Sequence, residues 1–77
     1  MPIINPNPTN LEKARRAAGL SREKLAELSG IPWGTIKEYE QGRNNINNAR
    51  AHIVVDLAEA LGVPVQQIMN ERSAADA

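Results

Sequence analysis

Residues 21–43 read SREKLAELSGIPWGTIKEYEQGR and carry the clearest prediction of the fold. Ser21 has the short polar side chain that caps the N-terminus of a helix, and Gly30 is suited to end that helix. Pro32 follows Gly30 after a single intervening residue and is suited to open a second helix. That second helix is expected to stop at Gly42. The stretch therefore predicts two short helices joined by a very short connection.

The spacing of small and branched residues indicates how these two helices meet. Ala26 lies four residues before Gly30, and Ile36 lies six residues after it. The small side chain of Ala26 allows close approach, Gly30 permits a sharp turn, and Ile36 fills the wedge between the helices. The first helix of the pair also contains the apolar residues Leu25 and Leu28. Such a pair is a helix-turn-helix arrangement, although an ordinary corner of a helical bundle can carry the same residues.

One further helix is expected upstream of this pair. Thr9 or Asn10 caps its N-terminus, and Thr9 together with Glu12 fits a capping box. Gly19 ends the helix in a left-handed conformation. Its expected apolar face comprises Leu11, Ala14 and Ala18.

Two more helices are expected downstream. Residues 44–48 form an asparagine-rich loop whose amides serve as caps or meet phosphates, and Asn47 or Asn48 caps the helix that follows. Gly62 ends that helix, and Pro64 opens a last short one. The apolar residues of these two helices are Val54, Leu57, Ala58, Leu61, Val65, Ile68 and Met69. Because no alternating β-branched run is present, the sequence predicts an all-α domain of five helices.

The two ends of the chain differ from its centre in composition. Residues 1–9 carry three prolines among Asn and Thr, so they are expected to form an extended or disordered arm. Residues 71–77 are small and polar and are expected to fray. The domain itself is expected to span residues 10–70. The N-terminus has no basic stretch before an apolar run, so we expect no signal peptide and a cytoplasmic location.

Composition excludes several classes of site. The 77 residues contain no Cys and one His, which excludes disulfides and thiolate zinc sites and argues against a histidine-based metal site. No catalytic triad, phosphate-binding glycine loop or apolar carboxylate pair is recognisable, so we expect neither an enzyme nor a cofactor. Nine basic residues balance nine acidic ones. Nucleic-acid binding must therefore rest on local charge, and the seven basic and five acidic residues of 10–43 give that half a small excess.

A longer series of residues falls in one order along the chain: Arg15, Gly19-Leu20-Ser21, Leu25-Ala26, Gly30-Ile31, Thr35-Ile36, Tyr39-Glu40-Gln41-Gly42-Arg43 and Leu57-Ala58-Glu59-Ala60-Leu61-Gly62-Val63. This series resembles the Cro/cI-type helix-turn-helix family, also called the XRE family, of phage-repressor-like regulators. The resemblance runs from about Leu11 to Met69, and residues 39–49 look like a subgroup with a longer loop. It implies a compact, lambda-repressor-like domain of five helices that binds double-stranded DNA, usually as a homodimer.

The second helix of the central pair has two contrasting faces. At about 100° per residue, Ile36 and Tyr39 point together into the core. An α-helix fits the major groove of DNA, where its N-terminal residues reach base edges. The resemblance implies that the base-reading residues are Trp33, Gly34, Lys37 and Glu38. The last three lie on the side away from Ile36 and Tyr39, and Trp33 lies at its border.

Each of these four residues has an expected role in DNA reading. Lys37 can donate to guanine O6 or N7 and Glu38 can accept from cytosine N4, although both also fit ordinary solvated charges. Gly34 has no side chain and lets the backbone approach closely. Trp33 contacts a thymine methyl or a sugar if it reads DNA, and otherwise covers the edge between the two helices.

Phosphate contacts are expected on either side of the reading helix. Arg22 lies in the first turn of the preceding helix, where the resembled family places a polar phosphate contact and where the helix N-terminus assists. Arg43 follows the end of the reading helix, and Thr35 offers a hydroxyl on its flank. The resemblance implies a structural role for Arg15 and Glu40, as a buried or half-buried ion pair between the first and third helices.

Apolar residues in the second half of the chain exceed what one core face needs, which predicts a dimer. The expected two-fold interface near the C-terminus comprises Ile53, Val55, Val65, Ile68 and Met69, although most of the last three are also expected to pack inward. Two copies on a palindromic site place their reading helices one turn of DNA apart, about 34–36 Å.

We interpret the chain as a sequence-specific DNA-binding transcription regulator, and as a repressor. One alternative is an antitoxin or protein-interaction module of the same fold, whose main partner is a protein such as a toxin. The other is a helical interaction domain that has lost DNA binding, which Trp33, Gly34 and the zero net charge would permit.

Overall fold

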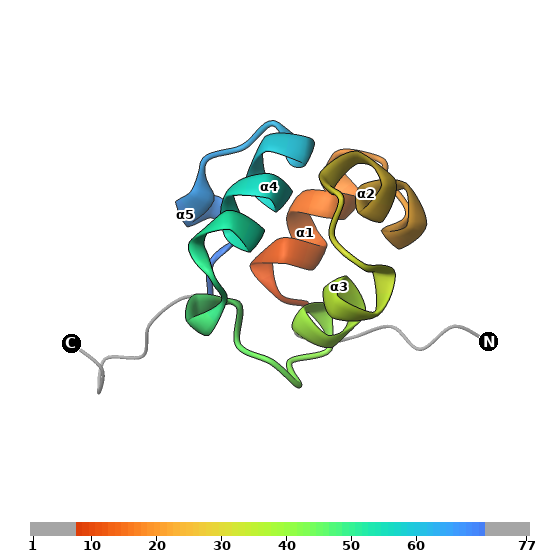
Figure 1. Cartoon of the computed structure of the whole chain (residues 1–77). Helices are drawn as coiled ribbons and strands as arrows, with labels where there is room; N and C mark the ends of the chain where they lie inside the picture. Colours follow the sequence, from red (N-terminus) through yellow and green to blue (C-terminus); the bar gives the residue numbers. More distant parts are fainter. Residues whose placement is uncertain (1–7, 71–77) are drawn as a thin grey trace.

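The computed structural model describes residues 8–70. Its elements are, in order, α1 (Asn10–Ala17), α2 (Arg22–Ser29), α3 (Trp33–Glu40), the 3₁₀ turn η1 (Ile46–Asn48), α4 (Ala51–Leu61) and α5 (Val65–Ile68). In Figure 1, α1 lies centrally, with α2 and α3 on one side and α4 and α5 on the other. The predicted all-α architecture of five α-helices is confirmed for this part of the chain. The expected tail at 71–77, and all but Pro8 and Thr9 of the expected arm, lie outside the described residues.

Every element contributes one fully buried apolar side chain to a single core. These six side chains are Leu11, Leu25, Ile36, Ile46, Leu57 and Ile68. Helix α1 packs against α3 and α5, α2 packs against α3 and α4, and α4 packs against α5. Because burial of one Leu or Ile side chain contributes roughly 1.5–3 kcal/mol, these six positions supply much of the driving force for folding. The predicted α4 face, formed by Val54, Leu57, Ala58 and Leu61, is buried as well.

Local signals place most of the helix ends where the sequence predicts them. The Thr9 side chain accepts a hydrogen bond from the Glu12 N–H at 3.3 Å, and the Ser21 side chain accepts one from the Lys24 N–H at 3.0 Å. Gly30 has a φ of 76°, a left-handed conformation that side chains resist, and its N–H donates to Ala26 O at 2.9 Å. The sharp turn between α2 and α3 is therefore built as expected.

Four details of the prediction are wrong. Ala18 is exposed because α1 ends at Ala17, and Arg15 takes the next inward position instead. Leu28 is 53% exposed because it lies about 60° around the α2 axis from Leu25, outside the stripe that faces the core. Helix α4 begins one residue after Arg50, which makes no side-chain cap, so neither predicted asparagine caps it. Pro32 is the N-cap of α3 rather than its first residue.

The asparagines after α3 hold the end of α5 rather than the start of α4. Asn47 Nδ2 donates to Asn70 O at 3.0 Å, while Asn47 Oδ1 accepts from Asn70 N–H at 2.8 Å. Asn70 Nδ2 also donates to Asn45 Oδ1 at 3.0 Å. From α1, Asn10 Nδ2 donates to Met69 O at 2.7 Å. This amide cluster, formed by Asn10, Asn45, Asn47 and Asn70, fixes where the chain leaves the domain.

Candidate nucleic-acid interface

The orientation of α3 about its axis is set by the side chains that it buries. Ile36 and Glu40 are fully buried and Tyr39 is 8% exposed. These three residues face α1 and α2, because both helices pack against α3. Of the four residues predicted to read bases, Trp33, Gly34 and Glu38 are exposed, and Lys37 is half-buried. Gly34 and Glu38 thus lie on the side of α3 that the core does not use, and Trp33 and Lys37 lie at its border.

The buried Glu40 carboxylate receives the Arg15 side chain in a two-point ion pair. Arg15 Nε lies 2.6 Å from Glu40 Oε2, and Arg15 Nη2 lies 3.1 Å from Glu40 Oε1. The remaining Arg15 nitrogen, Nη1, donates to Leu20 O at 2.7 Å. This geometry joins α1 to α3 and satisfies the carboxylate in a place that water does not reach.

A second arginine shares the same carboxylate. Arg22 Nε donates to Glu40 Oε1 at 2.8 Å, so Arg15, Arg22 and Glu40 form a three-residue cluster that joins α1, α2 and α3. The Arg22 side chain remains 27% exposed. Sequence reasoning assigned Arg22 to phosphate contact alone and missed this bond. Eighteen residues separate the two partners, so no helical periodicity in the sequence indicates their contact.

Trp33 and Lys37 form one unit on the exposed side of α3. The Lys37 Nζ atom lies 5.1 Å from the centroid of the Trp33 ring, one helical turn away. A cation at this distance over an exposed ring is stabilised by roughly 0.5–1 kcal/mol. Trp33 is 40% exposed, so much of the ring is accessible. The contact favours a conformation in which the two side chains lie together on α3.

Gly34 has no role inside the domain that requires a glycine. Its φ is not among the four positive glycine values, which belong to Gly19, Gly30, Gly42 and Gly62. A Cβ atom built at Gly34 would meet no other atom within 4 Å. A helical glycine costs about 1 kcal/mol relative to alanine. The unobstructed backbone at this exposed position is therefore available for close approach of a ligand.

Three polar residues on or just after α3 retain accessible surface, and they are Glu38, Arg43 and Thr35. Glu38 Oε2 accepts a hydrogen bond from Asn44 Nδ2 at 2.6 Å, and within residues 8–70 its other carboxylate oxygen accepts none. Arg43 is exposed, and its backbone N–H donates to Glu38 O at 3.0 Å. Thr35 is half-buried on the flank of α3. Two of the predicted phosphate contacts, Arg22 and Arg43, thus lie at the first residue of α2 and just after α3.

The residues predicted for a dimer interface divide into two groups. Ile68 is fully buried in the core of a single chain, so it is not available to a partner and drops out of the predicted interface. Val55 is 39% exposed on α4. Ile53, Val65 and Met69 are partly buried against the core and retain some accessible surface. Val55 is thus the most accessible large apolar residue of α4 and α5.

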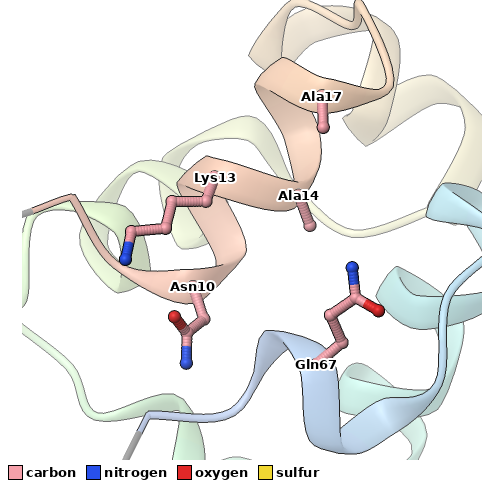
Figure 2. A pocket seen from close by; sticks show the side chains of 5 residues that line it. All are labelled: Asn10, Lys13, Ala14, Ala17 and Gln67. Carbon is pink, nitrogen blue, oxygen red and sulfur yellow. The ribbon is translucent and has the colours of Figure 1, made fainter.

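A pocket lies elsewhere, between α1 and α5. Figure 2 shows its lining residues, which are Asn10, Lys13, Ala14, Ala17 and Gln67. None of these is a predicted DNA-contacting residue. Among residues 8–70, no group of three or more His, Cys, Asp or Glu side chains could hold a metal ion. Within the same range, no helix is long and apolar enough to cross a membrane.

Comparison with known proteins places the chain among regulators. It is 33% identical over 66 residues to a transcriptional regulator in the ATPase CF(0) region of Rhodospirillum rubrum, covering 86% of this chain and 58% of that protein. Over 30 residues it is 50% identical to repressor protein C of Escherichia phage P2, covering 39% of this chain and 30% of that protein. The chain thus spans less than two thirds of the length of both relatives.

A solved structure is also similar. The restriction-modification controller protein C.AhdI from Aeromonas hydrophila superposes with a TM-score of 0.69 at 32% identity, covering 78% of this chain and 86% of that one. Residues 11–68 match the family model HTH_3, helix-turn-helix. That range begins in α1 and ends with α5, so it contains the whole described bundle. The chain therefore belongs to the Cro/cI-type, or XRE, helix-turn-helix family.

Proposed function

We propose that this protein is a transcription regulator that binds double-stranded DNA and reads the major groove with α3. The observation that carries the proposal is the division of α3 into two sides. Ile36, Tyr39 and Glu40 are held by α1 and α2, and the opposite side presents polar and aromatic groups to solvent. The names of its relatives, which include a transcriptional regulator and a phage repressor, support the same function.

Base reading is assigned to the exposed side of α3. Lys37 donates to guanine O6 or N7 from a position beside the Trp33 ring, and Trp33 contacts a thymine methyl or a sugar. Glu38 accepts from cytosine N4 with the carboxylate oxygen that Asn44 leaves open. Gly34 allows the α3 backbone to come close to the groove.

Affinity and register are assigned to phosphate contacts by Arg22, Arg43 and Thr35. The chain has zero net charge, so binding depends on where these charges lie rather than on their total. Each neutralised phosphate releases counterions, and the slope of log K against log salt changes by about 0.9 per contact. We therefore expect the affinity for DNA to fall strongly with salt concentration, even though the chain has no net charge.

A homodimer is proposed on a palindromic site, through the accessible apolar residues of α4 and α5. Val55 is the most exposed of them, and Ile53, Val65 and Met69 are partly buried against the core. The interface is small, so the free protein is expected to be largely monomeric and to dimerise on DNA. Sedimentation with and without a palindromic duplex tests this. A strictly one-to-one complex without cooperativity between half-sites would contradict it.

Repression, rather than activation, is proposed because one relative is a phage repressor. A protein bound over a promoter can repress by occupying it, without a second domain. The antitoxin alternative has no observation of its own in its favour among the described residues. A toxin gene next to the gene of this protein would favour it, and so would a stable complex with the co-expressed toxin.

The experiment that tests the function is selection of bound duplexes from a random pool. The unaltered protein is expected to enrich one palindromic sequence with half-sites about 10 base pairs apart. The double variant Lys37→Ala/Glu38→Ala should lose affinity for that sequence far more than for random DNA, because one good base contact contributes about 1–3 kcal/mol. An unchanged consensus and unchanged affinity would show that α3 is not the reader. Failure of the unaltered protein to retain any duplex would reject the function altogether.

A further inference from the structure

The cluster of Arg15, Arg22 and Glu40 contains two arginines that use the same carboxylate in different ways. Arg15 turns its whole guanidinium inward, because Nε and Nη2 bond Glu40 and Nη1 bonds Leu20 O. Arg22 turns only Nε inward, to Glu40 Oε1 at 2.8 Å. Within residues 8–70, neither Nη atom of Arg22 makes a hydrogen bond, and the side chain is 27% exposed.

We propose that Glu40 is a positioning residue for DNA binding, which holds Arg22 by Nε so that both Nη atoms point at one phosphate of the duplex. This inference rests on the proposed function. Glu40 itself is fully buried and cannot touch DNA. Its effect is transmitted through the rigid guanidinium plane, which presents one edge to Glu40 and another to solvent.

The charges of the cluster favour this arrangement over a purely structural one. Two guanidinium groups share one carboxylate, so the cluster keeps one net positive charge. Arg15 alone already gives the carboxylate two hydrogen bonds. Arg22 is the more exposed partner and lies at the first residue of α2, where the helix N-terminus also favours an anion. The surplus positive charge therefore lies where a phosphate can bind. The bond to Glu40 already restricts the rotamer of the Arg22 side chain.

The geometry distinguishes Arg22 from a lysine. An arginine can bond Glu40 and a phosphate together, because its donors point in different directions from one plane. A lysine ammonium is a point charge that either pairs with the carboxylate or reaches out to the phosphate. The variant Arg22→Lys therefore keeps the charge and the pairing of Glu40 but should lose the held phosphate contact.

The test compares Arg22→Lys with the unaltered protein in binding to a selected duplex at several salt concentrations. We expect Arg22→Lys to bind about tenfold more weakly and to lower the salt slope by about 0.9 per protomer, with its melting curve little changed. A salt slope equal to that of the unaltered protein would overturn the proposal. It would mean either that Arg22 is only structural or that any cation at this position serves. If the unaltered protein shows no salt-dependent duplex binding, the proposed function fails instead.

A second variant separates positioning from charge. Glu40→Gln removes one negative charge, which by charge alone should tighten DNA binding, whereas loss of positioning should weaken it. Glu27→Gln is the matched control, because Glu27 lies on α2 with a side chain 72% exposed and outside the cluster. We expect weaker binding per folded molecule for Glu40→Gln and equal or slightly tighter binding for the control. Tighter binding by both variants would overturn the proposal.

A measurement on the unaltered protein covers the case in which these variants fold poorly. The side-chain Nε–H of Arg22 should exchange slowly with water in the free and the DNA-bound states, because Glu40 holds it in both. Arg50 is the internal reference, because it is exposed, makes no side-chain hydrogen bond within residues 8–70 and is not a proposed DNA contact. Equally fast exchange of the two Nε–H groups in the complex would show that Glu40 does not hold Arg22 there.

Discussion

The two halves of the bundle are joined by different chemistry. In residues 10–43, α1, α2 and α3 meet around a buried carboxylate shared by two arginines. In the other half, the amide cluster joins the segment before α4, the end of α5 and the start of α1 by uncharged hydrogen bonds. The cluster of Arg15, Arg22 and Glu40, here called the charged joint, leaves one surplus positive charge beside α3. The amide cluster, here called the neutral joint, carries no charge. The difference fits the proposed function, because the surplus charge lies beside the helix that is proposed to bind DNA, and no charge is used where only the chain must be held.

The largest effect is expected from breaking the charged joint. Glu40→Ala leaves Arg15 buried without its partner, which should lower the free energy of unfolding by about 3–5 kcal/mol. Urea unfolding followed by circular dichroism measures this. Glu59→Ala, at an exposed position of α4, is the control and should change little. A loss for Glu40→Ala as small as that of the control would mean that the charged joint is dispensable.

Breaking the neutral joint should have a smaller effect and no effect on DNA. Asn47→Ala removes both partners of the half-buried Asn70 backbone, which should cost about 1–3 kcal/mol of unfolding free energy. Affinity for duplex DNA, per folded molecule, should stay unchanged. Asn48→Ala is the control, because Asn48 is the exposed neighbour. A specific loss of DNA affinity in Asn47→Ala would contradict the assignment of this joint to structure alone.

The third prediction is that one substitution, Gly34→Ala, raises stability and weakens DNA binding. Gly34→Ala should raise the free energy of unfolding by up to about 1 kcal/mol, because Gly34 is helical and its Cβ would meet open space. The same methyl group should weaken DNA binding by holding the α3 backbone away from the groove. Gly42→Ala is the contrasting variant and should destabilise, because Gly42 has a φ of 78°. Thermal melting and duplex titration of both variants provide the test, and unweakened binding by Gly34→Ala would rule out close approach there.

The smallest effect on folding is expected at Arg43. This exposed residue follows α3, so Arg43→Ala should leave the melting temperature within error. It should weaken binding to all duplexes similarly and reduce the salt slope by about 0.9 per protomer. Titrations of one selected and one random duplex at several salt concentrations measure this. A change confined to the selected duplex would make Arg43 a base-reading residue.

Local signals in the sequence predicted the fold well because each acts over a few residues. Ser21 and Thr9 cap their helices, and Gly30 turns the chain between α2 and α3. The inward stripe of α4 follows from its helical period. Leu28 was misplaced because a helix of eight residues shows too little periodicity to separate its stripe from neighbouring positions.

Contacts between distant residues could not be predicted in the same way. The bond from Arg22 to Glu40 spans 18 positions, and the bonds from Asn47 to Asn70 span 23. An asparagine can cap a helix, satisfy a turn or bond a distant backbone group, and its sequence neighbourhood does not choose among these. The contact between Trp33 and Lys37 could have been predicted, because residues four apart share one side of a helix.

The central claim, that the exposed side of α3 lies against duplex DNA, is tested most directly through Trp33. It is the only tryptophan of the chain, so its fluorescence reports on that position alone. Acrylamide quenching should be measured in the free protein and at saturation with the selected duplex, while a label on the DNA reports binding independently. We predict that Trp33 becomes strongly protected from acrylamide on binding, and that added salt reverses this protection together with the DNA signal. Binding reported by the DNA label, with Trp33 as accessible as in the free protein, would contradict the account.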